Sequence, residues 1–415
     1  MTDTTTITAE AAEATVAGRF PWPRPRIDPP EVYQWLREER PVTRVITHAG
    51  DPAWLVTRYD DVRAILSDPR VSADMQNPGL PALVAGTKTE EFGSGALLRQ
   101  DPPMHTVYRR MLSKNFMVKR VEAMRPAIQK LVDEKIDAML AAPEHPVDFV
   151  QSLALPVPST VLSWILGVRE KDIPFFNGAA EELLTGDPTD PESARQFQRN
   201  QMALVNYVTE LAQERAAADD PGDDILGQLV KAALEGTITF DDVAEVGFVL
   251  TVAGHDTTAS MSAMGLLTLL QHPEQLAELQ AEPELIPDAV EEMLRYLTVV
   301  NLIIVRVATE DIEIGGVVIP AGEGIIPLNF SANRDDAHYP DAAKFDIHRK
   351  ARDHFAFGYG MHQCLGQPLA RVELQVIFET LLRRIPDLKL AVPVEELPFK
   401  VFSPINGVFK LPVTW

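Results

Sequence analysis

The chain has 415 residues, 46% of them hydrophobic, and its 60 acidic against 38 basic side chains give a formal net charge of −22. This excess of acid excludes a nucleic-acid surface, because neutralising phosphates requires a surplus of Lys and Arg. A single cysteine excludes an internal disulfide, and the N-terminus lacks the basic start and apolar run of a signal peptide. With no uninterrupted membrane span in the sequence, we expect a soluble, cytoplasmic monomer.

The first quarter of the chain is predicted to mix helices with a small sheet. Residues 1–20 are predicted to be a mobile leader, and a proline-rich entry at 21–30 opens one large domain over 21–415. Helical patterns at 31–39 and 60–66 flank two β-like runs at 42–46 and 53–57. Residues 72–98 lack clean periodicity, which predicts a long adaptable loop of the kind that is often functional.

The rest of the chain is mostly helical in its spacing. Prolines divide residues 104–235 into five or six predicted helices. The stretch 239–270 predicts a helix about 48 Å long, apolar on nearly every side, as expected for a helix that runs through a core. A helix at 288–297, a β-like region at 302–326, a coil at 333–357 and a last long helix at 366–384 follow. We therefore predict a mainly α fold with small β-sheets.

The segment from Phe357 to Gly366 reads FGYGMHQCLG and holds the only cysteine, Cys364. Its glycines permit a tight turn, and a helix is predicted to begin just after Cys364, where the helix dipole and free N–H groups favour a thiolate. A lone cysteine is otherwise most often a small buried hydrophobe. The segment resembles the haem-binding signature of the cytochromes P-450. The resemblance implies that Cys364 is the axial ligand of the haem iron, with Phe357 beside the sulfur, Gly358 in the turn and Gly366 against the ring.

A polar cluster, Ala253 to Thr258, interrupts the middle of the long apolar helix. Buried polar groups are costly unless they are satisfied or used. Thr257 can donate back to the carbonyl of Ala253, and Gly254 offers a bare spot, so we predict a groove here. Ordinary back-bonding threonines with a water-bonded aspartate would be the alternative. The cluster resembles the family's oxygen-activation segment, which implies that Asp256 and Thr257 relay protons as an acid followed by an alcohol.

Glu292 and Arg295 lie at the i, i+3 spacing of one helix face. Most such pairs are solvated surface bridges that contribute little. The pair nevertheless resembles the family's Glu-x-x-Arg motif, which implies a structural role with Arg349 as the third partner.

A haem also carries two propionates that need cations if they are partly buried. Each candidate alone could be an ordinary surface charge, but the family uses cations at the matching positions, which here are His105, Arg109, Arg306 and His362.

The resemblance spans the chain from about residue 28 to the C-terminus and is closest to soluble, actinomycete-type members. It implies a haem b (heme b, iron protoporphyrin IX) between the central helix and the last long helix, with O2 as co-substrate and one oxygen atom inserted into a C–H bond. No reductase domain is fused to the chain, so we expect electrons from NAD(P)H through a separate ferredoxin or flavodoxin with its reductase. A basic cluster suits such a partner, although a solvated helix face is the alternative: Arg109, Arg110, Lys114, Lys119 and Arg120.

The substrate pocket is expected to draw on 72–98, 175–205 and a set of apolar positions: Val249, Ala253, Leu302, Ile303 and Ile405. These predict a medium or large lipophilic substrate, such as a macrolide, terpenoid, steroid-like molecule or xenobiotic. Two alternatives are a haem-thiolate peroxygenase, which usually alters the acid-alcohol pair, and a non-enzymatic haem sensor or electron carrier, which needs neither proton relay nor substrate cavity.

Overall fold

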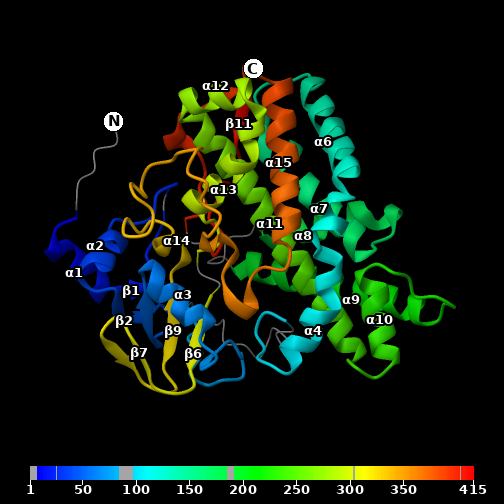
Figure 1. Ribbon diagram of the computed structural model, residues 1–415. Coiled ribbons are helices and arrows are strands. Elements are labelled where there is room, and N and C mark those ends of the chain that lie inside the picture. Colours follow the sequence, from blue (N-terminus) through cyan, green and yellow to red (C-terminus); the bar gives the residue numbers. More distant parts are fainter. Residues whose placement is uncertain (1–6, 25, 84–96, 185–190, 302–303, 402) are drawn as a thin grey trace.

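The computed structural model describes residues 7–24, 26–83, 97–184, 191–301, 304–401 and 403–415. A mixed sheet with short flanking helices forms one side of the molecule, and a body of helices forms the other (Figure 1). The predicted alternation of small sheet, helices and small sheet therefore appears in space as two neighbouring regions.

The larger sheet joins strands from both ends of the chain in the order β1-β2-β3-β9-β6-β4. Its strands are β1 (Arg19–Phe20), β2 (Val42–Thr47), β3 (Pro52–Val56), β4 (Val71–Ser72), β6 (Arg306–Ala308) and β9 (Gly324–Pro327). The antiparallel pair β2 and β3 pairs Val42 with Val56, and β9 runs parallel to β3, with Gly324 beside Ala53. Helices α2 (Val32–Glu39) and α3 (Tyr59–Ser67) are the first of the predicted helices. This sheet brings Arg306 to the same core as the N-terminal part of the chain.

The leader differs from its prediction in the part that the structure describes. Residues Ala9–Ala17 form helix α1, which begins at Thr8, whose side chain accepts a hydrogen bond from the Ala11 N–H. Ala12 is completely buried, and Glu13 pairs with Arg40 at the end of α2 at 2.7 Å. Strand β1 then pairs in parallel with β2. Residues 8–20 are thus packed onto the sheet region rather than separate from it.

Within the described residues, the segment 104–235 contains seven α-helices, one more than the five or six predicted. These helices are α4 (Met104–Ser113), α5 (Val118–Glu122), α6 (Arg125–Leu140), α7 (Pro156–Leu166), α8 (Ile173–Leu184), α9 (Pro191–Ala216) and α10 (Ile225–Leu234). They are followed by α11 (Phe240–Leu270), α12 (Pro273–Ala281), α13 (Ile286–Leu297), α14 (Asn329–Ala332) and α15 (Gln367–Arg384). Two small sheets complete the fold, one of β5 (Val147–Asp148), β10 (Lys389–Leu390) and β11 (Pro412–Thr414), the other of β7 (Ile312–Ile314) and β8 (Val317–Ile319).

Helix α11 is the central element and has the bounds that its sequence pattern predicts. A reciprocal capping box starts it: the Asp242 N–H donates to the Thr239 hydroxyl, and the Asp242 carboxylate accepts from the Thr239 N–H at 2.7 Å. It packs against α7, α9, α13 and α15, so most of its side chains are buried. Although α11 has 31 residues, none of the helices in the described ranges is both long and apolar enough to span a membrane.

Candidate functional site

The loop before α15 is held in a tight, specific shape around Cys364. Gly358 and Gly360 have φ of +70° and +73°, a region that favours glycine. A Cβ on Gly360 would lie only 2.2 Å from the carbonyl oxygen of Leu66, so this position requires a glycine for a second reason. The Cys364 N–H donates to the Phe357 carbonyl at 2.8 Å, which closes the loop.

The sulfur of Cys364 combines two properties that rarely coincide. Its side chain is exposed, yet burial raises the pKa of the thiol, and only the backbone N–H groups of Gly366 and Gln367 and the charges of Arg109 and Arg371 act in the other direction. The side chain is therefore accessible but desolvated by the protein around it. The positive charges and N–H donors directed at it are those that stabilise a thiolate ligand.

One face of α11 is open in the same way. Ala253 is exposed and Val249 and Thr257 are partly exposed, although they lie on an otherwise buried helix at successive four-residue steps. The Thr257 hydroxyl donates to the Ala253 carbonyl at 2.8 Å, as its position predicts. The bare spot expected at Gly254 is not free, because a Cβ there would meet the Leu162 side chain at 3.3 Å.

Asp256 lies on a neighbouring face of α11 and is almost fully buried. Its carboxylate accepts from the Lys400 ammonium at 2.6 Å and from the Ser260 hydroxyl at 3.2 Å. Among the described residues, no hydrogen bond joins it to Thr257. Sequence reasoning did not find Lys400, because the pair joins positions 144 apart and a lone lysine in a C-terminal tail gives no signal of burial.

Four predicted cations converge near the Cys364 loop. The rings of His105 and His362 have centroids 4.3 Å apart, and the Arg109 guanidinium donates to the Gln363 carbonyl at 2.6 Å. Arg306 reaches the same group from β6, and its side chain is buried. The four come from three separate segments, namely α4, β6 and the loop before α15.

The electrostatics of these four side chains favour the binding of an anionic group. Burial, Arg306, His105 and Arg109 together lower the pKa of His362 to about 3. Burial and then Arg109 lower the pKa of His105, whose Nε2 is buried with no hydrogen-bond partner in the described structure. With these pKa values lowered, both imidazoles are neutral at pH 7, and an anionic group beside them and beside the guanidinium groups of Arg109 and Arg306 would raise their pKa values again. The set therefore fits a group with carboxylates, as the two propionates of a haem would require.

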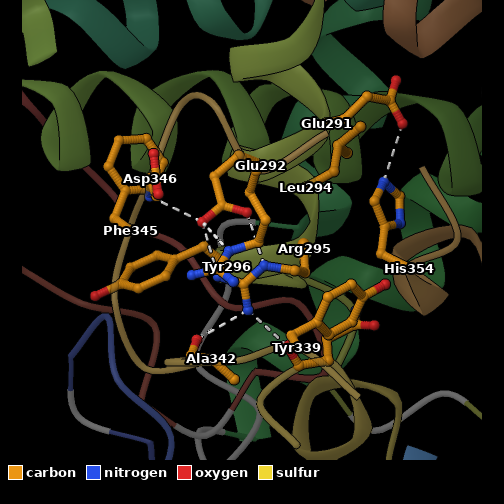
Figure 2. A network of polar contacts seen from close by, with 12 residues as sticks. Glu291, Glu292, Leu294, Arg295, Tyr296, Tyr339, Ala342, Phe345, Asp346 and His354 are labelled. Carbon is orange, nitrogen blue, oxygen red and sulfur yellow. Dashed lines mark hydrogen bonds and ion pairs between the residues drawn. The ribbon is translucent and has the colours of Figure 1, made fainter. Parts of the chain in front are cut away.

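The Glu292–Arg295 pair of α13 forms a buried brace (Figure 2). Arg295 donates through Nε and Nη2 to the two carboxylate oxygens of Glu292, at 2.7 and 2.8 Å, and both side chains are 0% exposed. Its remaining donors bind the carbonyls of Asn333 and Ala342. Arg349 approaches Glu292 with its Nε at 3.3 Å, as the third member. The fork geometry of arginine explains why one side chain can hold this many partners.

The brace reaches the Cys364 loop through Asn333. While Arg295 holds the Asn333 carbonyl, the Asn333 side-chain oxygen accepts from the Phe355 N–H at 2.8 Å, two residues before Phe357. Beside it, Glu291 pairs with Arg371 at 2.6 Å and lies 3.2 Å from His354. The guanidinium of Arg371 in turn stacks 4.6 Å from the centroid of the Phe357 ring.

The predicted substrate contacts are only partly described. Val249 and Ala253 lie on the open face of α11, as above. Leu302 and Ile303, and residues 84–96 of the loop predicted at 72–98, lie outside the described residues. Ile405 is buried in the main core and forms a β-bridge with Val300.

Comparisons with known proteins place these features in one family. A family model described as cytochrome P-450 matches residues 14–390. The chain is 47% identical over 426 residues to the cytochrome P-450 GfsF from Streptomyces halstedii, covering 100% of both chains. It is 43% identical over 415 residues to vitamin D3 dihydroxylase from Streptomyces griseolus, covering 99% of this chain and 100% of that one. The crystal structure of GfsF matches it with a TM-score of 0.90 at 47% identity, over 96% of this chain and 100% of that chain. The predicted family and the mainly α fold with small sheets are confirmed.

Proposed function

The chain belongs to the cytochrome P-450 family and is a haem-thiolate monooxygenase, and from this premise we propose how its own residues serve that reaction. Cys364 would hold the haem iron through its thiolate. The observation that carries this assignment is the accessible sulfur in a desolvated position, with backbone N–H groups and two arginine charges directed at it. When bound, the haem supplies the iron at which O2 is reduced and a C–H bond of the substrate is oxygenated.

His105, Arg109, Arg306 and His362 hold the haem propionates. The Arg306 and Arg109 charges help to lower the pKa of His362, and His105 Nε2 has no hydrogen-bond partner in the described structure. Both observations support this role, because carboxylates would offset the charges and could bond to that nitrogen. Phe357, Gly358 and Gly366 shape the loop around the ligand, and a Cβ on Gly366 would approach the Cys364 sulfur to 4.0 Å. The Glu292, Arg295 and Arg349 brace keeps this loop in place through Asn333.

Thr257 and Asp256 manage protons. The Thr257 hydroxyl lies on the open face of α11 and is fixed by its bond to the Ala253 carbonyl, so it can receive a proton and present it toward the haem side. The Asp256 carboxyl is next to it in the chain and is held among polar groups, from which protons can be supplied.

The substrate is a medium or large lipophilic molecule that is oxidised against the Val249, Ala253 and Thr257 face of α11. The apolar character of this face supports the assignment, as does the steroid-related substrate named for the vitamin D3 dihydroxylase relative. Leu302, Ile303 and Ile405 are the other proposed contacts. Substitution Ala253→Leu should weaken the binding of large ligands, measured by the shift of the haem absorption band, while imidazole still binds. Equal affinity for large ligands in both proteins would contradict the placement.

Electrons from NAD(P)H arrive through a ferredoxin or flavodoxin that docks on the surface beside the Cys364 loop. Four basic side chains of the predicted cluster are exposed around two exposed apolar ones, Met117 and Val118: Arg110, Lys114, Lys119 and Arg120. A basic surface with a small apolar centre suits a transient acidic partner.

The double variant Arg110→Glu/Lys114→Glu tests this docking surface. It should slow reduction by an acidic ferredoxin, most strongly at low salt, and leave ligand binding unchanged. Lys389→Glu on β10 is the matched control, because its sheet lies at the other end of the molecule from α4 in Figure 1. Equal reduction rates in all three proteins would remove the proposal.

The ligand assignment is tested by the absorption spectrum of the reduced protein with carbon monoxide. A thiolate ligand gives a strongly red-shifted band that a histidine ligand does not. Wild-type protein should show it, and Cys364→Ser should lose it together with monooxygenase activity. A globin-like spectrum of the wild type, or full activity in Cys364→Ser, would overturn the assignment.

A further inference from the structure

A small cavity lies beside α11, next to the proposed proton relay. It is lined on α11 by Asp256, Ala259, Ser260 and Ala263, at positions that share one helix face, and across from them by Lys400. Asp256 is adjacent in the chain to Thr257, so the face of α11 that lines the cavity borders the open face that carries Thr257. The cavity measures about 20 Å³, which is room for about one water molecule.

One part of the cavity wall consists of buried polar and charged side chains, and another part consists of exposed ones. Asp256, Ser260 and Lys400 are buried, whereas Gln151 and Phe409, which also line it, are exposed. A water here could bond to a carboxylate, a hydroxyl and an ammonium group, which is the number of polar partners that internal waters usually have. The cavity thus leads from the protein surface to the carboxylate of Asp256.

Lys400 is built into this place by its backbone. The Lys400 N–H donates to the Gly407 carbonyl at 2.9 Å, which closes the turn from 400 to 407. A Cβ on Gly407 would lie 2.6 Å from the Ser260 hydroxyl oxygen, so the turn packs directly on α11. The Lys400 ammonium lies 5.8 Å from the centroid of the Phe409 ring, and Lys400 is only 8% exposed.

A buried ion pair of this kind is a poor device for stability alone. Removing two charges from water is unfavourable, and well-packed apolar residues in their place are often as stable. The pair is bonded at 2.6 Å, with the Ser260 hydroxyl 3.2 Å from Asp256 and 3.4 Å from Lys400. This charged pair lies beside a cavity that has room for a water molecule, and Asp256 is adjacent in the chain to Thr257. A role in proton transfer accounts for such a pair.

We propose that Lys400 is a positioning residue that keeps Asp256 ionised at the wall of this cavity, so that Asp256 takes its protons from water there. The inference rests on the proposed relay through Asp256 and Thr257. A solvent proton adds to the cavity water as one O–H bond of that water breaks and an O–H bond forms on Asp256. The water is unchanged and no electrons move. Asp256 then passes the proton to the Thr257 side of α11.

Infrared spectroscopy of the haem-loaded protein tests the charge state directly. In Lys400→Met, the buried Asp256 loses its counter-charge and should be protonated at neutral pH, which gives the carbonyl stretch of a carboxylic acid. Relative to wild type, this band should be added only in Lys400→Met, and not in Lys400→Arg, which keeps the charge, or in Lys400→Met/Asp256→Asn; buried Glu373, whose pKa is raised to about 8, contributes equally to all four proteins and cancels in the difference spectra. His255, the other titratable group beside the pair, has its pKa lowered to about 4 mainly by burial, and it contributes no carbonyl band. A Lys400→Met protein without the band overturns the proposal.

Turnover provides the second measurement. With electrons in excess, Lys400→Met should form product at least about tenfold more slowly, divert reducing equivalents to hydrogen peroxide and show a larger solvent deuterium isotope effect. Lys400→Arg should recover most of the rate, and the carbon monoxide and ligand-induced spectra should be unchanged in both. Ala263→Val narrows the cavity without touching the ion pair and should raise the isotope effect too, which keeps the test available if Lys400→Met does not fold.

The outcomes separate this inference from the relay on which it rests. If Asp256→Asn is slow but Lys400→Met and Ala263→Val behave as wild type, the relay stands and the role of Lys400 and its cavity is refuted. If Asp256→Asn itself turns over normally with an unchanged isotope effect, the proposed relay fails first.

Discussion

Replacing Glu292 by Gln should be the most destabilising single change in the brace that supports the Cys364 loop. The substitution keeps the shape of the side chain but removes its charge. Arg295 then retains a fully buried guanidinium that has carbonyls and tyrosine rings beside it but no carboxylate, and Arg349 loses its carboxylate as well. The amide nitrogen of Gln also brings a donor toward donors, so one of the two bonds to Arg295 becomes a repulsive contact.

The size of the effect follows from the burial of the pair. Breaking a buried ion pair by removing one partner costs about 3–5 kcal/mol, because an uncompensated charge stays behind. Asp288→Asn offers a matched acid-to-amide control on the same helix. Its partner Arg352 lies 2.8 Å from Asp288 and has a side chain that is 71% exposed. An exposed ion pair contributes less than about 1 kcal/mol to the free energy of unfolding.

The assay is urea unfolding of the haem-loaded proteins, followed by circular dichroism and by the haem absorption band. Glu292→Gln should lower the free energy of unfolding by several kcal/mol, and the haem should dissociate at lower urea, because Asn333 connects the brace to Phe355. A loss no larger than that of Asp288→Asn would refute the argument that this pair is an energetic support of the ligand loop.

Three further changes have defined outcomes. Burial would raise the pKa of Glu291, but neighbouring cations, Arg371 among them, hold it at about 2. The stabilisation of the folded state by ionised Glu291 is therefore complete above the ordinary pKa of 4.5 and disappears as the pH falls toward 2. The unfolding free energies of wild type and Glu291→Gln should converge on acidification. Burial raises the pKa of Glu373 from 4.5 to about 8, so the folded state binds the extra proton and loses stability as the pH rises between these values; Glu373→Gln should flatten that decline in thermal unfolding. Gly360→Ala forces a Cβ against the Leu66 carbonyl at positive φ and should lower haem content at purification, measured by the ratio of haem to protein absorbance.

The fold class could be predicted because its strongest elements have local signals. The 31-residue helix α11 has long apolar stretches on both sides of its central polar cluster and a capping box, and the Cys364 segment combines glycines at required positive φ with a helix start. Helix α1 gave no such signal. It has nine residues, and a helix that short is marginal alone; it is held by burial of Ala12 and by the Glu13 pair with Arg40.

The site was predictable where residues act through their own segment and not where distant segments meet. Thr257 bonds to Ala253 within one helical turn, so sequence spacing was sufficient. The Lys400 contact with Asp256 and the Leu162 contact with Gly254 depend on which helices and turns pack together, which no local pattern encodes. The open position expected at Gly254 is instead found at Ala253, whose side chain is exposed.

The donors directed at the Cys364 sulfur have a consequence for how such a protein can diversify. They are main-chain N–H groups of Gly366 and Gln367, so mutation of neighbouring side chains leaves the donors themselves in the chain. Changes that remodel the walls around Ala253 can therefore accumulate over generations while the electronic character of the proposed metal ligand is inherited intact.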